Sequence, residues 1–162
     1  MLQVRKLLPD DVPALADIVR RLPGYFTDDV PGKVSIDAGR HGGWVIVDRD
    51  GIAGFAVVDQ RSPAVSEILW IAVDPARRRR GVGTLLLEHV LGVLAAGGVS
   101  LVEAKTLDAS AGYEPYEATR GFWEARGFVM VDTIDPLPDW QPGNPCAIYV
   151  AAVRPTRGPI SR

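Results

Sequence analysis

One segment near the middle of the chain joins an apolar run to an amphipathic run through a turn of arginines and glycines. It reads Ile71-Ala72-Val73-Asp74-Pro75-Ala76, then four consecutive arginines at 77–80, then Gly81-Val82-Gly83-Thr84. The apolar run predicts a strand over 65–73, and the spacing of Leu86, Val90 and Val93 predicts a helix over 82–96. The chain must therefore fold so that a strand passes, through a basic turn, straight into a helix.

This turn has the features of an anion site. The first turn of a helix has unpaired N–H groups and a partial positive charge. Glycines at 81 and 83 let the backbone approach a phosphate closely, and arginines add charge and paired donors. The segment lacks the Gly-x-Gly-x-x-Gly of dinucleotide sites and the Gly-Lys-Ser/Thr of nucleotide P-loops. The alternative is a solvated arginine surface beside an ordinary helix start.

The remaining elements predict an α/β (α+β) chain with a mixed sheet and helices on its faces. Strands are expected over 2–7, 44–47, 52–58, 99–104, 128–134 and 146–153, and helices over 9–22, 31–41 and 115–126. The chain lacks an internal repeat or linker, so we expect one domain over 1–154. Residues 155–162 are expected to form a flexible C-terminal tail.

Composition narrows the function classes. The 162 residues carry a net charge of −2 and one cysteine, Cys146. These values argue against a nucleic-acid partner, an internal disulfide and a Cys-rich metal site, and we expect no metal. The first ten residues are too polar for a secretory signal, and the longest apolar run is too short to span a membrane. We expect a cytoplasmic protein with no membrane partner.

Two motifs resemble those of the GNAT superfamily of acetyl-CoA-dependent N-acetyltransferases. The family's cofactor loop has Gln or Arg, two residues, Gly, one residue, then Gly or Ala, and Arg78 to Gly83 fit it. A later helix of the family often closes with an aromatic stretch and Gly-Phe, which Thr119 to Phe128 resemble. The resemblance covers roughly 2–153 and is specific over about 66–84 and 113–128. It implies a GNAT-like, mostly antiparallel six- to seven-stranded sheet with a splayed central parallel pair and helices on both faces.

The resemblance also implies a set of cofactor contacts, with acetyl-CoA as the acyl donor. Strand residues before the loop should contact the pantetheine arm and the acetyl carbonyl, and the loop should hold the pyrophosphate. Arg120 should reach a phosphate or anchor the nearby loop, and an exposed helical arginine is the alternative. The cofactor-binding residues expected are Ile71, Ala72, Val73, Arg78, Arg79, Arg80, Gly81, Val82, Gly83, Thr84, Arg120 and Trp123.

Direct transfer to an amine needs a base, and the leaving thiolate needs a donor. Glu67 is the predicted base, because it lies on the strand that leads into the cofactor site. Glu103 is the runner-up, and an exposed strand residue is the alternative for Glu67. Trp123 occupies the position where the family often has a tyrosine acid, and an indole cannot release its proton as a phenol does. Tyr116 is therefore predicted as the acid, Tyr113 can replace it, or CoA leaves as a thiolate.

The acceptor is expected to meet the N-terminal loop. Tyr25, Phe26, Asp28 and Asp29 are the predicted substrate-binding residues, and an aromatic and acidic lining suits a cationic amine. Trp140 lies in a late Pro-rich loop. The predicted reaction acetylates a primary amine of a small molecule through a ternary complex. The alternatives are acetylation of a protein N-terminus or lysine, and a non-catalytic acyl-CoA sensor. A homodimer through the C-terminal strands is also possible.

Overall fold

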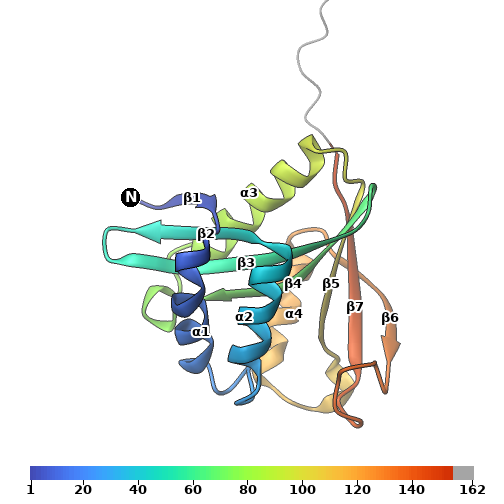
Figure 1. Cartoon of the computed structure of the whole chain (residues 1–162). Coiled ribbons are helices and arrows are strands. Elements are labelled where there is room, and N and C mark those ends of the chain that lie inside the picture. Colours follow the sequence, from blue (N-terminus) through green and yellow to red (C-terminus); the bar gives the residue numbers. More distant parts are fainter. Residues whose placement is uncertain (155–162) are drawn as a thin grey trace, which may run out of the picture.

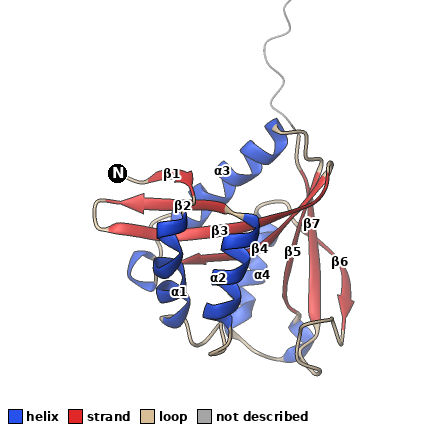
Figure 2. Ribbon diagram, viewed as in Figure 1, coloured by secondary structure: helices blue, strands red, loops and turns tan. Residues whose placement is uncertain are grey.

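The computed structural model describes residues 1–154, and within them seven strands form one sheet (Figure 1, Figure 2). The strand order across the sheet is β1-β2-β3-β4-β5-β7-β6. The bounds are β1 Gln3–Lys6, β2 Gly43–Asp48, β3 Gly51–Ser62, β4 Val65–Val73, β5 Leu101–Leu107, β6 Val129–Ile134 and β7 Cys146–Ala152.

Neighbouring strands are antiparallel throughout this sheet except at its centre. β4 and β5 are parallel, with Val65 opposite Leu101 and Ile68 opposite Ala104. The connection between them runs through the basic turn and a long helix, as a parallel crossover requires. The predicted mixed sheet with a central parallel pair is therefore confirmed.

Within residues 1–154, four helices cover the two faces of the sheet. α1 (Val12–Arg20) and α2 (Val30–His41) lie on one face, whereas α3 (Val82–Ala96) and α4 (Pro115–Ala125) lie on the other (Figure 1). Short 3-10 turns at Pro9–Asp11, Pro75–Arg77 and Ala109–Ala111 join strands to helices. Among residues 1–154, no helix combines the length and apolar character needed to cross a membrane.

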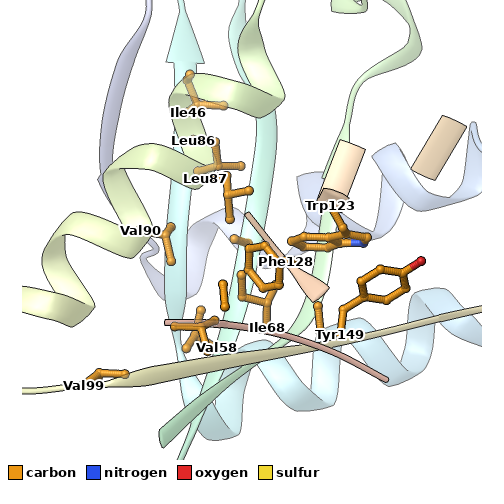
Figure 3. Close-up of a cluster of buried hydrophobic side chains, with 14 of the residues drawn as sticks. Ile46, Val58, Ile68, Leu86, Leu87, Val90, Val99, Trp123, Phe128 and Tyr149 are labelled. Atoms are coloured by element: carbon orange, nitrogen blue, oxygen red, sulfur yellow. The ribbon is translucent and has the colours of Figure 1, made fainter. Parts of the chain in front are cut away.

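Each face of the sheet has its own core. Leu15, Ile18, Val34 and Phe55 are fully buried between the sheet and the pair α1 and α2. On the other face, Leu86 and the other inward residues of α3 pack against the strands, and the aromatic side chains Trp123, Phe128 and Tyr149 extend this core (Figure 3). The rings of Trp123 and Phe128 are 4.8 Å apart. This packing fixes α3 and α4 against the central strands.

Two strands differ in extent from the sequence expectation. β3 continues through Asp59 to Ser62, because these polar residues pair with the first residues of β4 instead of forming a loop. β5 begins at Leu101 and runs to Leu107, three residues further than the apolar pattern indicated. Its continuation alternates Lys105, Thr106 and Leu107, and all three pair with β7. Both extensions depend on partners that are distant in the sequence.

The C-terminal strands occupy one side of the sheet, with β7 inside and β6 at the edge. Val129, Met130 and Val131 on β6 are exposed. Pairing of C-terminal strands across a homodimer therefore stays a prediction, and it would use β6. The expected tail at 155–162 lies outside the described residues.

Candidate active site

The central parallel strands separate partway along their length. Their pairing ends at Ile68 and Ala104, although β4 continues to Val73 and β5 to Leu107. Beyond that point β4 stays paired with β3, and β5 stays paired with β7. The edge of β4 from Leu69 to Val73 consequently faces a gap, with backbone groups that can pair with an extended ligand.

The basic turn follows the end of β4 and leads into α3. Gly81 caps the helix with φ of 72°, a left-handed conformation that favours glycine, and Arg79 also has positive φ at 64°. Gly83 has ordinary helical geometry in the first turn of α3. A Cβ added there would lie 3.5 Å from Phe122 and Val73, which is ordinary van der Waals contact. The two glycines thus leave the first N–H groups of α3 open to an anion.

The four arginines of the turn have different tasks. The Arg77 guanidinium donates to both oxygens of Asp48 at 3.2 Å and also pairs with the buried Asp74. Asp74 in turn accepts from the backbone N–H of Ala76 at 3.1 Å. Arg77 therefore holds the turn against the sheet, and Arg78, Arg79 and Arg80 remain exposed.

A single large cleft connects the gap between the strands with the basic turn. Its volume is about 1340 Å³, which exceeds the few hundred to 1,000 Å³ usual for one small ligand. Residues from β4, the basic turn, the start of α3, β5 and α4 line it, together with the loop between α1 and α2. The late loop that carries Trp140 contributes to the same lining. The cleft is large enough for two ligands side by side.

Two tyrosines near the start of α4 fasten the loop between α1 and α2 across this cleft. The Tyr113 hydroxyl donates to the Gly24 carbonyl at 2.8 Å, and the Tyr116 hydroxyl donates to the Tyr25 carbonyl. Burial raises the pKa of Tyr116 to about 12, so its phenol keeps its proton at neutral pH. Arg78 lies 5.1 Å from the centre of the Tyr25 ring, which links the same loop to the basic turn.

A network of charges lies where β4 and β5 begin to separate. Glu67 is buried, and its carboxylate is 3.0 Å from Lys105 and 3.3 Å from Arg61. Glu103 is 3.5 Å from the same lysine. Burial alone would lower the pKa of Lys105, but the Glu67 and Glu103 carboxylates outweigh it and raise the pKa. Lys105 is thus held as an ammonium beside the cleft that it lines.

The sequence profile of the acetyltransferase (GNAT) domain matches residues 39–130, more than half of the chain. The chain belongs to the GNAT acetyltransferase family. The match spans the separated strands, the basic turn, α3 and α4, which build most of the cleft, whereas the loop between α1 and α2 and the late loop with Trp140 lie outside the match. A comparison with curated proteins finds no match.

Solved structures share the GNAT fold along nearly the whole chain. A GNAT-family protein from Desulfovibrio desulfuricans superposes with a TM-score of 0.80 at 24% identity, covering 94% of this chain and 99% of that one. A ribosomal-protein alanine N-acetyltransferase from Escherichia coli gives 0.75 at 22%, covering 100% and 99%. An aminoglycoside 6'-N-acetyltransferase complexed with coenzyme A gives 0.72 at 17%, covering 96% and 99%. At these identities the likeness shows the fold alone.

Most of the residues predicted from the sequence come together in this GNAT cleft. The lining includes Tyr25, Phe26, Asp29, Ile71, Ala72, Val73, Arg78, Arg79, Gly81, Val82, Gly83, Thr84, Tyr116 and Trp123. Trp123 contributes little surface, because it is only 3% exposed within the core. β4, the basic turn and the start of α3 therefore line one cleft, as the sequence motif predicted.

Other predicted residues do not line the cleft. Asp28 and Arg80 are exposed outside it, and Arg120 donates to the Leu107 carbonyl at 3.0 Å. Glu67 and its runner-up Glu103 lie behind Lys105. The roles predicted for these residues stay predictions.

Three residues near the site gave no signal in the sequence. Trp70 lines the cleft from β4, where it looked like an ordinary strand residue, and Lys105 lines it from β5, one residue beyond the strand predicted over 99–104. Arg126 packs 4.1 Å over the Phe122 ring and donates to the Thr84 hydroxyl in the first turn of α3. Arg126 and Thr84 are 42 residues apart, so spacing along the sequence cannot reveal this contact.

Proposed function

We propose that this GNAT protein is an N-acetyltransferase that moves the acetyl group of acetyl-CoA directly to a primary amine of a small molecule. The observation that carries the proposal is the separation of β4 from β5 beside the basic turn, within one cleft. The gap offers strand edge to an extended arm, and the turn offers cations and helix N–H groups to phosphates.

The residues of the cleft fit acetyl-CoA. The free edge at Ile71, Ala72 and Val73 would hold the pantetheine arm, and Arg78, Arg79 and the first turn of α3 would hold the pyrophosphate. When bound, the cosubstrate supplies an acetyl thioester. The N–H groups of this edge would donate to the acetyl oxygen where negative charge develops.

Direct transfer is supported by the state of the lone cysteine. Cys146 is fully buried in β7 and lies outside the cleft lining. Burial raises the pKa of its thiol to about 11, so the nucleophilic thiolate is scarce at neutral pH. An acyl-enzyme on this residue is therefore unfavourable, which supports a mechanism in which the acceptor amine and the acetyl donor occupy the cleft together.

The fastened loop supports a small acceptor over a protein chain. A peptide needs an open groove, whereas the loop at Gly24 and Tyr25 is tied to Tyr113 and Tyr116 across the cleft. Acetylation of a protein N-terminus or lysine, and acyl-CoA sensing without catalysis, remain as outcomes of the experiment below.

The test combines melting curves with an assay of free CoA thiol. At about 100 times the dissociation constant, acetyl-CoA should add about 2.7 kcal/mol of stability and raise Tm by about 5–10 °C. Gly83→Asp should abolish the shift, because its carboxylate repels phosphate while suiting the helix N-terminus. Gly92→Asp is the control, since Gly92 lies open on the same helix outside the cleft.

The acceptor assay follows with small amines and with peptides bearing free N-termini or lysines. Release of CoA with small amines, and an acetylated product by mass spectrometry, support the proposal. Turnover of peptides alone would assign a protein acceptor. A Tm shift without CoA release for any acceptor would identify a sensor. If millimolar acetyl-CoA causes no shift, the proposal fails.

A further inference from the structure

Resting on the proposed function, we propose that the acceptor is an amine with an aromatic or flat apolar body, which the rings of Tyr25, Phe26 and Trp70 receive. These three side chains line the end of the cleft formed by β4 and the loop between α1 and α2. Tyr116, from α4, completes the enclosure.

Three of the polar groups on the aromatic side chains around this end of the cleft are already hydrogen-bonded within the protein, and the hydroxyl of Tyr25 is the one left without a partner among the described residues. The Trp70 indole N–H donates to the Asp37 carboxylate at 2.7 Å. The Tyr116 hydroxyl donates to the Tyr25 carbonyl, and the Tyr113 hydroxyl donates to Gly24. An acceptor therefore meets mainly ring surface here, with the Tyr25 hydroxyl as the one unpartnered polar group of these rings among the described residues. A hydroxyl-rich acceptor would lose most of its hydrogen bonds to water without replacement.

The rings are arranged in two edge-to-face pairs. Phe26 and Trp70 are 6.2 Å apart at 65°, and Tyr25 and Tyr116 are 5.5 Å apart at 61°. Edge-to-face contacts of this kind are a preferred geometry of aromatic pairs. Because Arg78 lies over the Tyr25 ring, a further ring would pack chiefly against Phe26 and Trp70. The Asp37 hydrogen bond fixes the Trp70 ring, so the enclosure is formed in advance.

One of the two carboxylates that line the cleft among the described residues is paired within the protein, and the charge nearest the Tyr25 ring is the Arg78 cation. Asp29 pairs with Lys33 at 2.7 Å, and both are exposed at the rim. The hydrogen bond from Lys33, helped by Thr27, lowers the pKa of Asp29 to about 2, so it stays ionised and paired at neutral pH. The other lining carboxylate among the described residues, Asp139, is exposed.

A polycationic acceptor needs several inward carboxylates, which the described lining does not offer. The acidic residues of the N-terminal loop therefore no longer favour a cationic amine, whereas the aromatic residues still favour an apolar body. The lining suits an amine with an apolar body and a single ammonium group, which loses its proton before the amine attacks the thioester.

The experiment compares four acceptors with the wild-type enzyme and acetyl-CoA: phenethylamine, tryptamine, cadaverine and spermidine. We expect kcat/KM for the two aromatic amines to exceed that for the two polyamines by at least about 10-fold. Phe26→Leu and Trp70→Leu should each reduce this ratio by about 10-fold through a higher KM for the aromatic amine. The Tm shift with acetyl-CoA should stay unchanged in both variants.

Two controls remove similar side chains elsewhere. Ile36→Ala shortens an exposed apolar residue of α2, and Trp44→Leu removes a tryptophan of β2, and neither position lines the cleft. Both should leave the acceptor ratio unchanged. Phe26→Leu keeps the test decisive if Trp70→Leu does not fold, because Phe26 lies on a partly exposed loop.

Failure of this inference differs from failure of the proposed function. Equal or better turnover of the polyamines, or an unchanged ratio in folded Phe26→Leu, overturns the inference while acetyl transfer stands. If no amine releases CoA, the proposed function fails, and Tm measured with CoA plus each amine decides the inference alone. Stabilisation by phenethylamine but not by cadaverine would then support it, and the reverse would overturn it.

Discussion

The two glycines of the turn before α3 serve different physical purposes. Gly81 adopts φ of 72°, which a side chain strains, whereas Gly83 is helical with room for a Cβ. Gly83→Ala should therefore raise the stability of the free protein by about 0.5–1 kcal/mol through helix propensity. If the backbone at Gly83 meets the pyrophosphate as proposed, the same methyl group should weaken acetyl-CoA binding.

Melting curves with and without acetyl-CoA measure both effects of Gly83→Ala. The free protein should melt at or above the wild-type Tm, and the acetyl-CoA shift should shrink. Gly92→Ala, on an open position of the same helix, should gain stability and keep the full shift. A full shift in Gly83→Ala would contradict close approach of the phosphates at this residue.

Glu67 is the residue predicted to act as the general base, and this role can be tested by substitution. A base at Glu67 must exchange its proton through Lys105, because the lysine lines the cleft and contacts the carboxylate at 3.0 Å. Glu67→Gln should lower kcat by about 100-fold and leave the acceptor KM nearly unchanged. Glu103→Gln is the matched control, since Glu103 contacts the same lysine. An unchanged kcat in Glu67→Gln, with only the KM altered, would show that Glu67 merely positions Lys105.

At the scale of elements, hydrogen bonds from the tyrosines at the start of α4 hold the loop after α1 in place. This contact shapes the part of the cleft proposed to bind the acceptor. Tyr116→Phe removes the donor to the Tyr25 carbonyl, and we expect a loss of about 1 kcal/mol, or about 2–4 °C in Tm. A tie alone predicts a higher acceptor KM with kcat unchanged. The acid role predicted for Tyr116 adds a fall in kcat.

Steady-state kinetics with the best acceptor separate these two roles of Tyr116. Tyr113→Phe is the control, because its hydrogen bond to Gly24 is exposed and its loss should cost less stability. If KM and kcat are both unchanged in Tyr116→Phe, neither its hydrogen bond to the Tyr25 carbonyl nor an acid role of Tyr116 contributes to turnover.

The elements also show what the sequence could and could not predict. The basic turn was predictable because strand, cations, glycines and helix are adjacent in the chain, and the bounds of β4 and α3 were predicted correctly. The separate task of Arg77 was not predictable, because its partner Asp48 is 29 residues away. Lys105 was missed for the same reason, since its neighbour Glu67 lies on the parallel strand.

At the scale of the whole molecule, the titrating groups predict a wide range of stable pH. Arg5 lowers the pKa of Asp11 through a hydrogen bond, and Arg77 does the same for Asp48. A lowered folded pKa contributes stability above the unfolded value that is lost as pH falls through the folded value. The acid limb of the stability curve should therefore lie below about pH 4.

The alkaline limb has the opposite sign. Burial raises the pKa of Tyr116 and of Tyr149 to about 12, with Glu124 adding to the effect at Tyr149. Raised folded values contribute stability that is complete below the unfolded pKa, near 10, and is lost as pH rises toward 12. Cys146, whose folded pKa is about 11, adds a loss of stability that begins above the unfolded thiol value near 8.5. Urea unfolding from pH 3 to 11 should thus give a plateau between about pH 4 and 8. Tyr149→Phe should flatten the alkaline limb and leave the acid limb unchanged, and a wild-type protein that loses stability between about pH 6 and 8 would contradict this assignment of the titrating groups.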